Sequence, residues 1–138
     1  MGHSKANVKN TIMPNESPNN IVLNKSYTFA LSIVELYKDL TDVKKEYVLS
    51  KQLLRSGTSI GANIAEAQAA ISKKDFIAKL SISAQESRET QYWLRLLVDS
   101  HFVDKDEQRI SEMFKEVDGL IRLLTSIIKS AQKNKGNV

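Results

Sequence analysis

The sequence lacks cysteine and is poor in proline and glycine, with two prolines and five glycines in 138 residues. Disulfide bridges and thiolate zinc sites are therefore excluded. Both prolines, Pro14 and Pro18, precede residue 20, so no later proline interrupts a helix. No apolar run approaches the roughly 18 residues of a membrane-spanning helix. The first residues lack the apolar centre of a secretory signal, and we therefore expect a cytoplasmic chain.

Residues that carry catalytic or metal chemistry are also scarce. The two histidines are His3 and His101, and neither belongs to a Glu-x-x-His pair of the kind that binds metal inside helix bundles. His101 stands near Asp99 and Asp104, but a solvated turn histidine is the simpler interpretation. No glycine-rich phosphate loop of either common pattern is present. We therefore expect no metal, no cofactor and no enzymatic activity.

The overall composition is that of one ordinary globular domain. Hydrophobic residues make up 41% of the chain and charged residues 26%. The formal net charge is +4. A charge of this size permits an anionic partner such as nucleic acid without requiring one.

From residue 24 onward the apolar residues recur with the period of an α-helix. We expect a flexible leader at 1–23, a bundle domain at 24–132 and a basic tail at 133–138. The predicted helices span residues 24–40, 46–69, 73–100 and 105–132. Ser72 with Asp75, and Asp104 with Glu107, are typical of the first turn of a helix. Short connections make neighbouring helices antiparallel, so the prediction is an all-α, up-down-up-down four-helix bundle.

The first predicted helix is apolar on two opposite faces at about 100° per residue. One face carries Tyr27, Ala30, Leu31, Val34 and Tyr37. The other carries Phe29, Ile33, Leu36 and Leu40. A bundle helix normally keeps one solvent face, so we expect a second copy of the chain to cover one of these rows. We assign Phe29, Ile33, Leu36 and Leu40 to that subunit interface. The alternative is that the other helices of the same chain bury both rows.

A polar row interrupts the apolar pattern in the second and third predicted helices. Antiparallel pairing of these helices brings their polar centres together. We predict a structural network in the bundle interior, in which Glu86 or Glu89 satisfies Arg55; a ligand pocket is the alternative. Its members are Arg55, Ser59, Asn63 and Glu86.

The cations of the last predicted helix gather on one face, which the small net charge does not reveal. Lys115, Arg122, Lys129 and Lys133 project within a narrow arc away from the apolar stripe. Arg88 and Arg95 form a shorter line on the preceding helix, with Tyr92 between them. Such rows favour contacts with phosphates that are weakly sequence-specific, although a solvated face that keeps the protein soluble is the alternative interpretation.

Several of these residues also carry a resemblance. The run Q-L-L-R-S at 52–56 is followed by S-I-G-A-N-I-A-E at 59–66, then by Asp75-Phe76 and Tyr92-Trp93-Leu94. Together they resemble the bacterial four-helix-bundle proteins named after reading frames in the intervening sequences of 23S ribosomal RNA genes. The resemblance covers residues 25–129. Gly61 replaces a common proline and Ala67 a common glycine, so the second helix is expected to continue past this point.

The resemblance implies a barrel-like homopentamer. A more distant similarity, to the accessory protein of diversity-generating retroelements, implies a nucleic-acid ligand and a reverse transcriptase or other nucleic-acid protein as a partner. The family has no settled activity. We therefore expect a non-catalytic oligomer that binds RNA or DNA, and the alternative is a protein-protein interaction or scaffold module.

Overall fold

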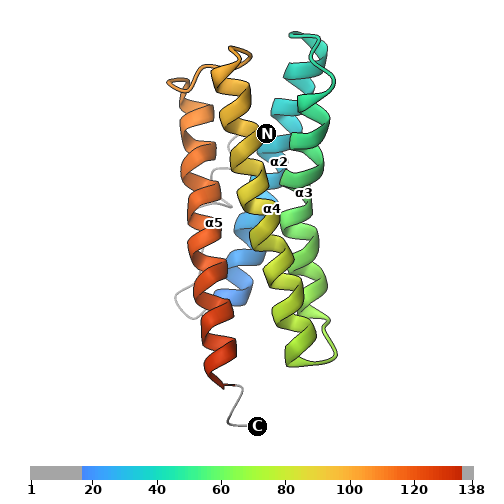
Figure 1. Ribbon diagram of the computed structural model, residues 1–138, viewed down its shortest axis with the longest axis vertical. Helices are drawn as coiled ribbons and strands as arrows, with labels where there is room; N and C mark the ends of the chain where they lie inside the picture. The colour runs from blue at the N-terminus through green and yellow to red at the C-terminus, as the bar shows by residue number, and fades with distance from the viewer. Residues whose placement is uncertain (1–16, 135–138) are drawn as a thin grey trace.

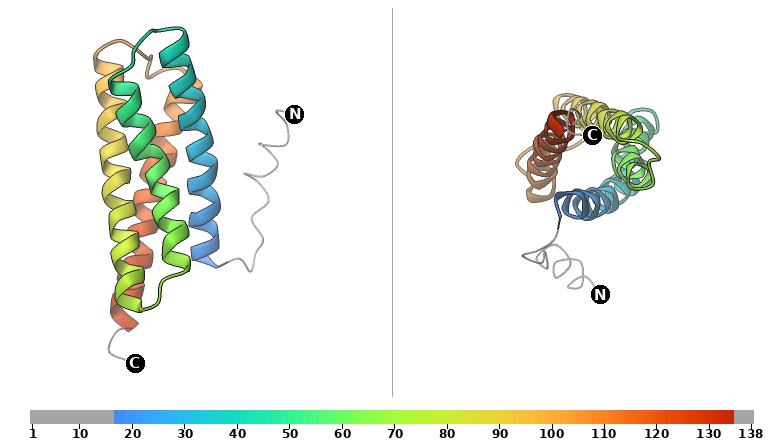
Figure 2. Two further views of the ribbon diagram at one scale, coloured as in Figure 1. Left: turned by 90° about the vertical axis from the view of Figure 1, so that its right-hand side faces the viewer. Right: turned by 90° about the horizontal axis from the view of Figure 1, so that it is seen from below.

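The computed structural model describes residues 17–134, which form four α-helices and no strand. These helices are α2 (Pro18–Asp42), α3 (Leu49–Gln68), α4 (Lys73–Asp99) and α5 (Gln108–Lys133). Figure 1 shows them running alternately up and down, and the end view in Figure 2 shows them as a ring. Contacts join α2 to α3, α3 to α4, α4 to α5 and α5 back to α2. The predicted all-α, four-helix architecture is therefore confirmed.

The first helix begins earlier than expected. Ser17 is the N-cap residue, its hydroxyl accepts a hydrogen bond from the backbone N–H of Asn20 at 3.3 Å, and Pro18 opens the helix. Residues 18–23 therefore belong to α2, and their assignment to a leader is wrong. The rest of the predicted leader (1–16) and most of the predicted tail (135–138) lie outside the described residues.

The second helix begins later than expected, at Leu49, because Glu46 caps it from outside. The Glu46 carboxylate accepts hydrogen bonds from the backbone N–H groups of Val48 at 3.1 Å, Leu49 at 3.0 Å and Ser50 at 2.7 Å. Partial burial alone raises the pKa of Glu46, but these hydrogen bonds, with one from the Ser50 hydroxyl, outweigh burial and lower the pKa below its ordinary value. The carboxylate thus satisfies backbone donors that the helix leaves unpaired.

One of the two predicted helix starts is confirmed and the other is wrong. The Ser72 hydroxyl accepts the backbone N–H of Asp75 at 3.0 Å and caps α4. The Asp104 carboxylate instead accepts the N–H of Asp106 at 2.9 Å within the connecting turn, and α5 starts at Gln108. Residues 105–107 thus belong to the turn.

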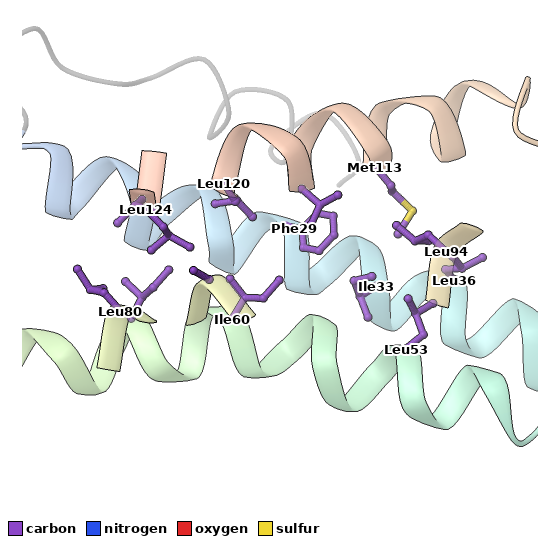
Figure 3. Packing of buried hydrophobic residues seen from close by; sticks show 14 of the residues in the cluster. Phe29, Ile33, Leu36, Leu53, Ile60, Leu80, Leu94, Met113, Leu120 and Leu124 are labelled. Atoms are coloured by element: carbon purple, nitrogen blue, oxygen red, sulfur yellow. The ribbon is translucent and has the colours of Figure 1, made fainter. Parts of the chain in front are cut away.

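The core occupies the centre of the ring along its whole length. Figure 3 shows side chains from all four helices meeting there. They include Phe29, Ile33 and Leu36 from α2, Leu53 and Ile60 from α3, Leu80 and Leu94 from α4, and Met113, Leu120 and Leu124 from α5.

The predicted subunit interface on α2 is part of this core. Phe29, Ile33, Leu36 and Leu40 are 0–1% exposed within a single chain. Their assignment to a contact between copies is therefore wrong, because α3 and α5 pack on that side of α2. The opposite apolar row points outward, and its Tyr27 is 67% exposed.

Candidate nucleic-acid interface

The predicted polar network divides into a surface part and a buried part. Arg55 donates to Glu86 at 3.2 Å, to a carboxylate oxygen of Glu89, and to the Gln52 side chain at 3.3 Å. The Arg55 side chain is 46% exposed, so the structure brings Arg55 and Glu86 together at the surface rather than in the interior. This cluster joins α3 to α4 in contact with solvent.

The hydrogen bonds of Ser59 and Asn63 stay within α3. The Ser59 hydroxyl donates to the Arg55 carbonyl at 2.6 Å, and the Asn63 amide donates to the Ser59 carbonyl at 2.8 Å. Both side chains therefore bond the backbone of their own helix. Their assignment to an interhelical network is wrong.

The hydrogen bonds that cross between α3 and α4 in the interior come from other residues. The Thr90 hydroxyl donates to the Ser56 hydroxyl at 2.9 Å, and the Ser83 hydroxyl donates to the Ile60 carbonyl at 2.8 Å. Ser56, Ser83 and Thr90 are fully buried, and each has a hydrogen-bond partner. Because small hydroxyl groups are satisfied by nearby backbone, this layer fixes the register of the two helices and leaves no group free for a ligand.

The cations predicted on α5 form a continuous exposed row. Lys115, Arg122, Lys129 and Lys133 are all exposed, on the side of α5 away from the core. Arg122 pairs with Asp118 at 3.0 Å, and the other three form no ion pair within the described residues. A shallow hollow runs along this part of α5, lined by Ile121, Arg122, Thr125, Ser126, Lys129, Ser130 and Lys133.

A second, shorter row lies on the neighbouring helix α4. Arg88 and Arg95 are exposed and form no ion pair with any described residue. Tyr92 lies between them and is 57% exposed. Its ring meets that of Trp93 edge to face, with centroids 5.0 Å apart and planes 75° apart. The Trp93 indole N–H donates to Glu89 at 3.0 Å, which joins the aromatic pair to the Arg55 cluster.

Sequence reasoning placed Tyr92 near these arginines but missed the contacts of Trp93. Trp93 stands next to Leu94 and four residues before Leu97, both of which belong to the apolar stripe. The periodic pattern therefore predicted a core residue and gave no sign of a contact with Tyr92. The available signal was the spacing of Glu89 and Trp93, four residues apart on one helix, which permits a side-chain hydrogen bond. A second ion pair also joins α3 to α4: the Lys79 ammonium donates to the Glu66 carboxylate at 3.0 Å, and this hydrogen bond raises the pKa of Lys79.

Two further features bear on the class of site. Within residues 17–134, no cluster of three or more histidine or acidic side chains is placed to hold a metal ion. In the same part of the chain, no helix has the length and apolarity that crossing a bilayer demands. A hollow lies between the α2–α3 and α4–α5 turns, and its lining mixes both signs of charge, including Asp39, Asp104, Lys105 and Arg109.

The fold and the surface together define a class: an antiparallel four-helix bundle with an apolar core and cations in rows on the outer faces of α4 and α5. The chain belongs to the 23S rRNA-intervening sequence protein family, which matches residues 18–126. The resemblance seen in the motifs around Asn63 and Trp93 is thereby confirmed.

A solved structure of similar fold agrees with this placement. It is a protein with unknown function from the S23 ribosomal protein family of Bacteroides thetaiotaomicron, 47% identical in sequence, with a TM-score of 0.78. The match covers 82% of the present chain and 99% of that protein. A comparison with curated proteins finds no match.

Proposed function

We propose that this chain is a non-catalytic module that binds RNA or DNA through phosphate contacts along the outer face of α5. The observation that carries the proposal is the exposed row of Lys115, Arg122, Lys129 and Lys133, of which only Arg122 is in an ion pair within the described residues. At 1.5 Å per residue, this row extends over about 27 Å of helix. A nucleic-acid backbone could therefore contact several of these cations at once.

Charge along α5 is also segregated by sign. After Asp118 the described part of the helix holds Arg122, Lys129 and Lys133 and no acidic residue. Binding of a polyanion releases counterions from its phosphates, so even weak individual contacts add up to affinity that depends steeply on salt. No base-reading motif is present, and the binding is accordingly expected to be weakly sequence-specific.

Self-association of the chain would multiply the number of α5 cations available to one nucleic acid. The outward row of α2 leaves Tyr27 and Leu31 exposed in a single chain, and covering such a row with a second copy removes apolar surface from water. We propose a homo-oligomer on this basis, and a pentamer on the basis of the family resemblance. Each added copy would contribute another set of α5 cations.

The proposed biological setting is the cytoplasm, with the bundle acting as an accessory to a nucleic-acid enzyme such as a reverse transcriptase. Support for a nucleic-acid setting comes from the family, which takes its name from an intervening sequence in 23S rRNA. The second candidate is a protein-protein interaction or scaffold module with no nucleic-acid role. The exposed α2 row supports that candidate, because an apolar surface can bind a different protein as well as a second copy of this chain.

The two candidates are separated by equilibrium binding to short RNA and DNA, as duplexes and as single strands, at low and moderate salt. The test variant carries Lys115→Glu, Arg122→Glu and Lys129→Glu. The matched control carries Lys38→Glu, Lys44→Glu and Lys51→Glu, three exposed cations of α2, α3 and their connection that form no ion pair within the described residues. Both variants change the net charge equally.

If the proposal is right, the wild type and the control bind at low salt and the α5 variant does not. Absence of binding by the wild type at low salt contradicts a nucleic-acid role and leaves the scaffold candidate. Equal loss in both variants contradicts the assignment of the site to α5, because it shows that only net charge matters.

A further inference from the structure

We infer that Tyr92, between Arg88 and Arg95, forms a stacking site for an unpaired base, so that the preferred partner is a single strand rather than a continuous duplex. This inference rests on the proposed function and adds the class of nucleic acid to it. Three features of α4 carry it: the exposure of the Tyr92 ring, the contacts that hold this ring in place, and the position of the two arginines.

Tyr92 is exposed at a position of α4 that does not belong to the hydrophobic core. It is 57% exposed in the C-terminal half of α4, while its neighbours Trp93 and Leu94 pack against or within the core. Its ring therefore contributes little to the interior, and one of its faces can receive a planar partner. An aromatic ring in this setting is the group that single-strand binding proteins use, because every base has a π-face.

The Tyr92 ring is held in place from one side. Trp93 meets it edge to face at 5.0 Å, and the Trp93 indole N–H is fixed on Glu89 at 3.0 Å. Glu89 in turn pairs with Arg55 of α3. A ring held by such contacts loses less conformational freedom when a base stacks on it, which favours binding.

The two arginines flank Tyr92 on the same face of α4, and we assign them to the phosphates on either side of a stacked nucleotide. Arg88 is four residues before Tyr92 and Arg95 three residues after it, so all three share one helix face. Neither arginine is in an ion pair with a described residue. Both guanidinium groups are thus available for phosphate oxygens or for stacking on the same base.

The neighbouring helix extends this surface. α4 packs directly against α5, and Figure 1 shows the two lying side by side over most of their length. A strand anchored at Tyr92 can therefore continue toward Lys115 and Arg122 of α5. Bases within a duplex are already stacked on one another, so only an unpaired nucleotide can use the Tyr92 ring.

The test measures binding of the full chain to an oligouridine strand of roughly 12 nucleotides and to an RNA duplex of the same length. Tyr92→Ser removes the ring, and Tyr92→Phe keeps it without the hydroxyl. The matched control is Tyr47→Ser, because Tyr47 lies in the α2–α3 connection with an almost equal exposure of 56%. A second readout is the emission of Trp93, the only tryptophan in the chain.

The expected result is a single-strand preference that Tyr92→Ser lowers about ten-fold, while Tyr92→Phe and Tyr47→Ser preserve it. Affinity for the duplex stays unchanged in all three variants. Binding of the single strand changes Trp93 emission in the wild type, and this change disappears in Tyr92→Ser because the base no longer reaches the aromatic pair.

Two other outcomes overturn the inference and are distinguishable from each other. Salt-sensitive binding with no effect of Tyr92→Ser contradicts the stacking site and leaves the phosphate proposal intact. Failure of the wild type to bind either strand or duplex at low salt contradicts the proposed function itself, and the stacking site with it.

Discussion

At residue 57 the absence of a side chain lets α3 lie against α2. A Cβ atom placed there would come within 2.8 Å of Ile33, which is fully buried and cannot move aside freely. Gly61 is near Ser26 of α2 in the same way, at 3.1 Å. Glycine costs roughly 1 kcal/mol inside a helix, and the close packing that it permits here offsets that cost.

Gly57→Ala is therefore expected to destabilise the bundle by up to about 2 kcal/mol, because an overpacking penalty of about 1–3 kcal/mol opposes a gain in helix propensity of about 1 kcal/mol. Gly119→Ala on α5 is the matched control, since a Cβ there meets nothing within 4 Å. It should stabilise the protein by up to about 1 kcal/mol. Urea unfolding measures both, and a stabilised Gly57→Ala would contradict the close contact.

The exposed position of Arg55 decides how much its ion pair with Glu86 contributes. An arginine left buried without its partner would cost about 3 kcal/mol. Because the Arg55 side chain is 46% exposed and keeps Glu89 as a partner, Glu86→Ala should lower the free energy of unfolding by less than about 1 kcal/mol. A loss of 3 kcal/mol or more in urea unfolding would place this pair in the interior instead.

The Glu46 cap predicts a specific dependence on pH. Because folding lowers the pKa of Glu46, its contribution is present above the unfolded-state pKa and is lost as pH falls through the folded-state pKa. Glu46→Gln should cost about 1 kcal/mol near pH 7. The difference from wild type in thermal unfolding should shrink in acid, and a difference that is constant with pH would contradict a charged cap.

At the scale of the helix, α2 shows what a periodic pattern can and cannot decide. The spacing established two opposed apolar rows, and the structure contains both. It could not say which row faces the core, because Phe29 and Ile33 on one side and Tyr27 and Leu31 on the other have similar apolar character. The choice depends on which row fits α3 and α5, and that is a property of three helices together.

The outward row of α2 predicts a change in assembly state. Leu31→Glu should shift sedimentation toward the monomer, because a carboxylate cannot be buried between two copies without a partner. Ile82→Glu on α4 is the matched control, since the exposures of Leu31 and Ile82 are close, at 37% and 39%. An unchanged oligomer in Leu31→Glu, or an equal shift in both, contradicts the α2 interface.

At the scale of the whole molecule, periodicity and short connections were sufficient to predict the number, order and direction of the helices. Boundaries were less certain, because caps such as Ser17 and Glu46 act from outside the periodic segment. The cationic row on α5 could be predicted, since exposure follows from lying opposite the apolar stripe. A pairing of Arg55 with Glu86 or Glu89 could be predicted too, but its position at the surface could not, because exposure depends on the distance and rotation between α3 and α4.

The outer face of this bundle is proposed to bind nucleic acid through several phosphates at once. The most direct test of this binding is the salt dependence of affinity for a short RNA strand. If four to six cations of α5 and α4 take part, the slope of log K against log salt concentration should be about −3 to −4. Reversing the charges of Lys115, Arg122 and Lys129 should flatten it. A slope between 0 and about −1 in the wild type would contradict multivalent phosphate binding.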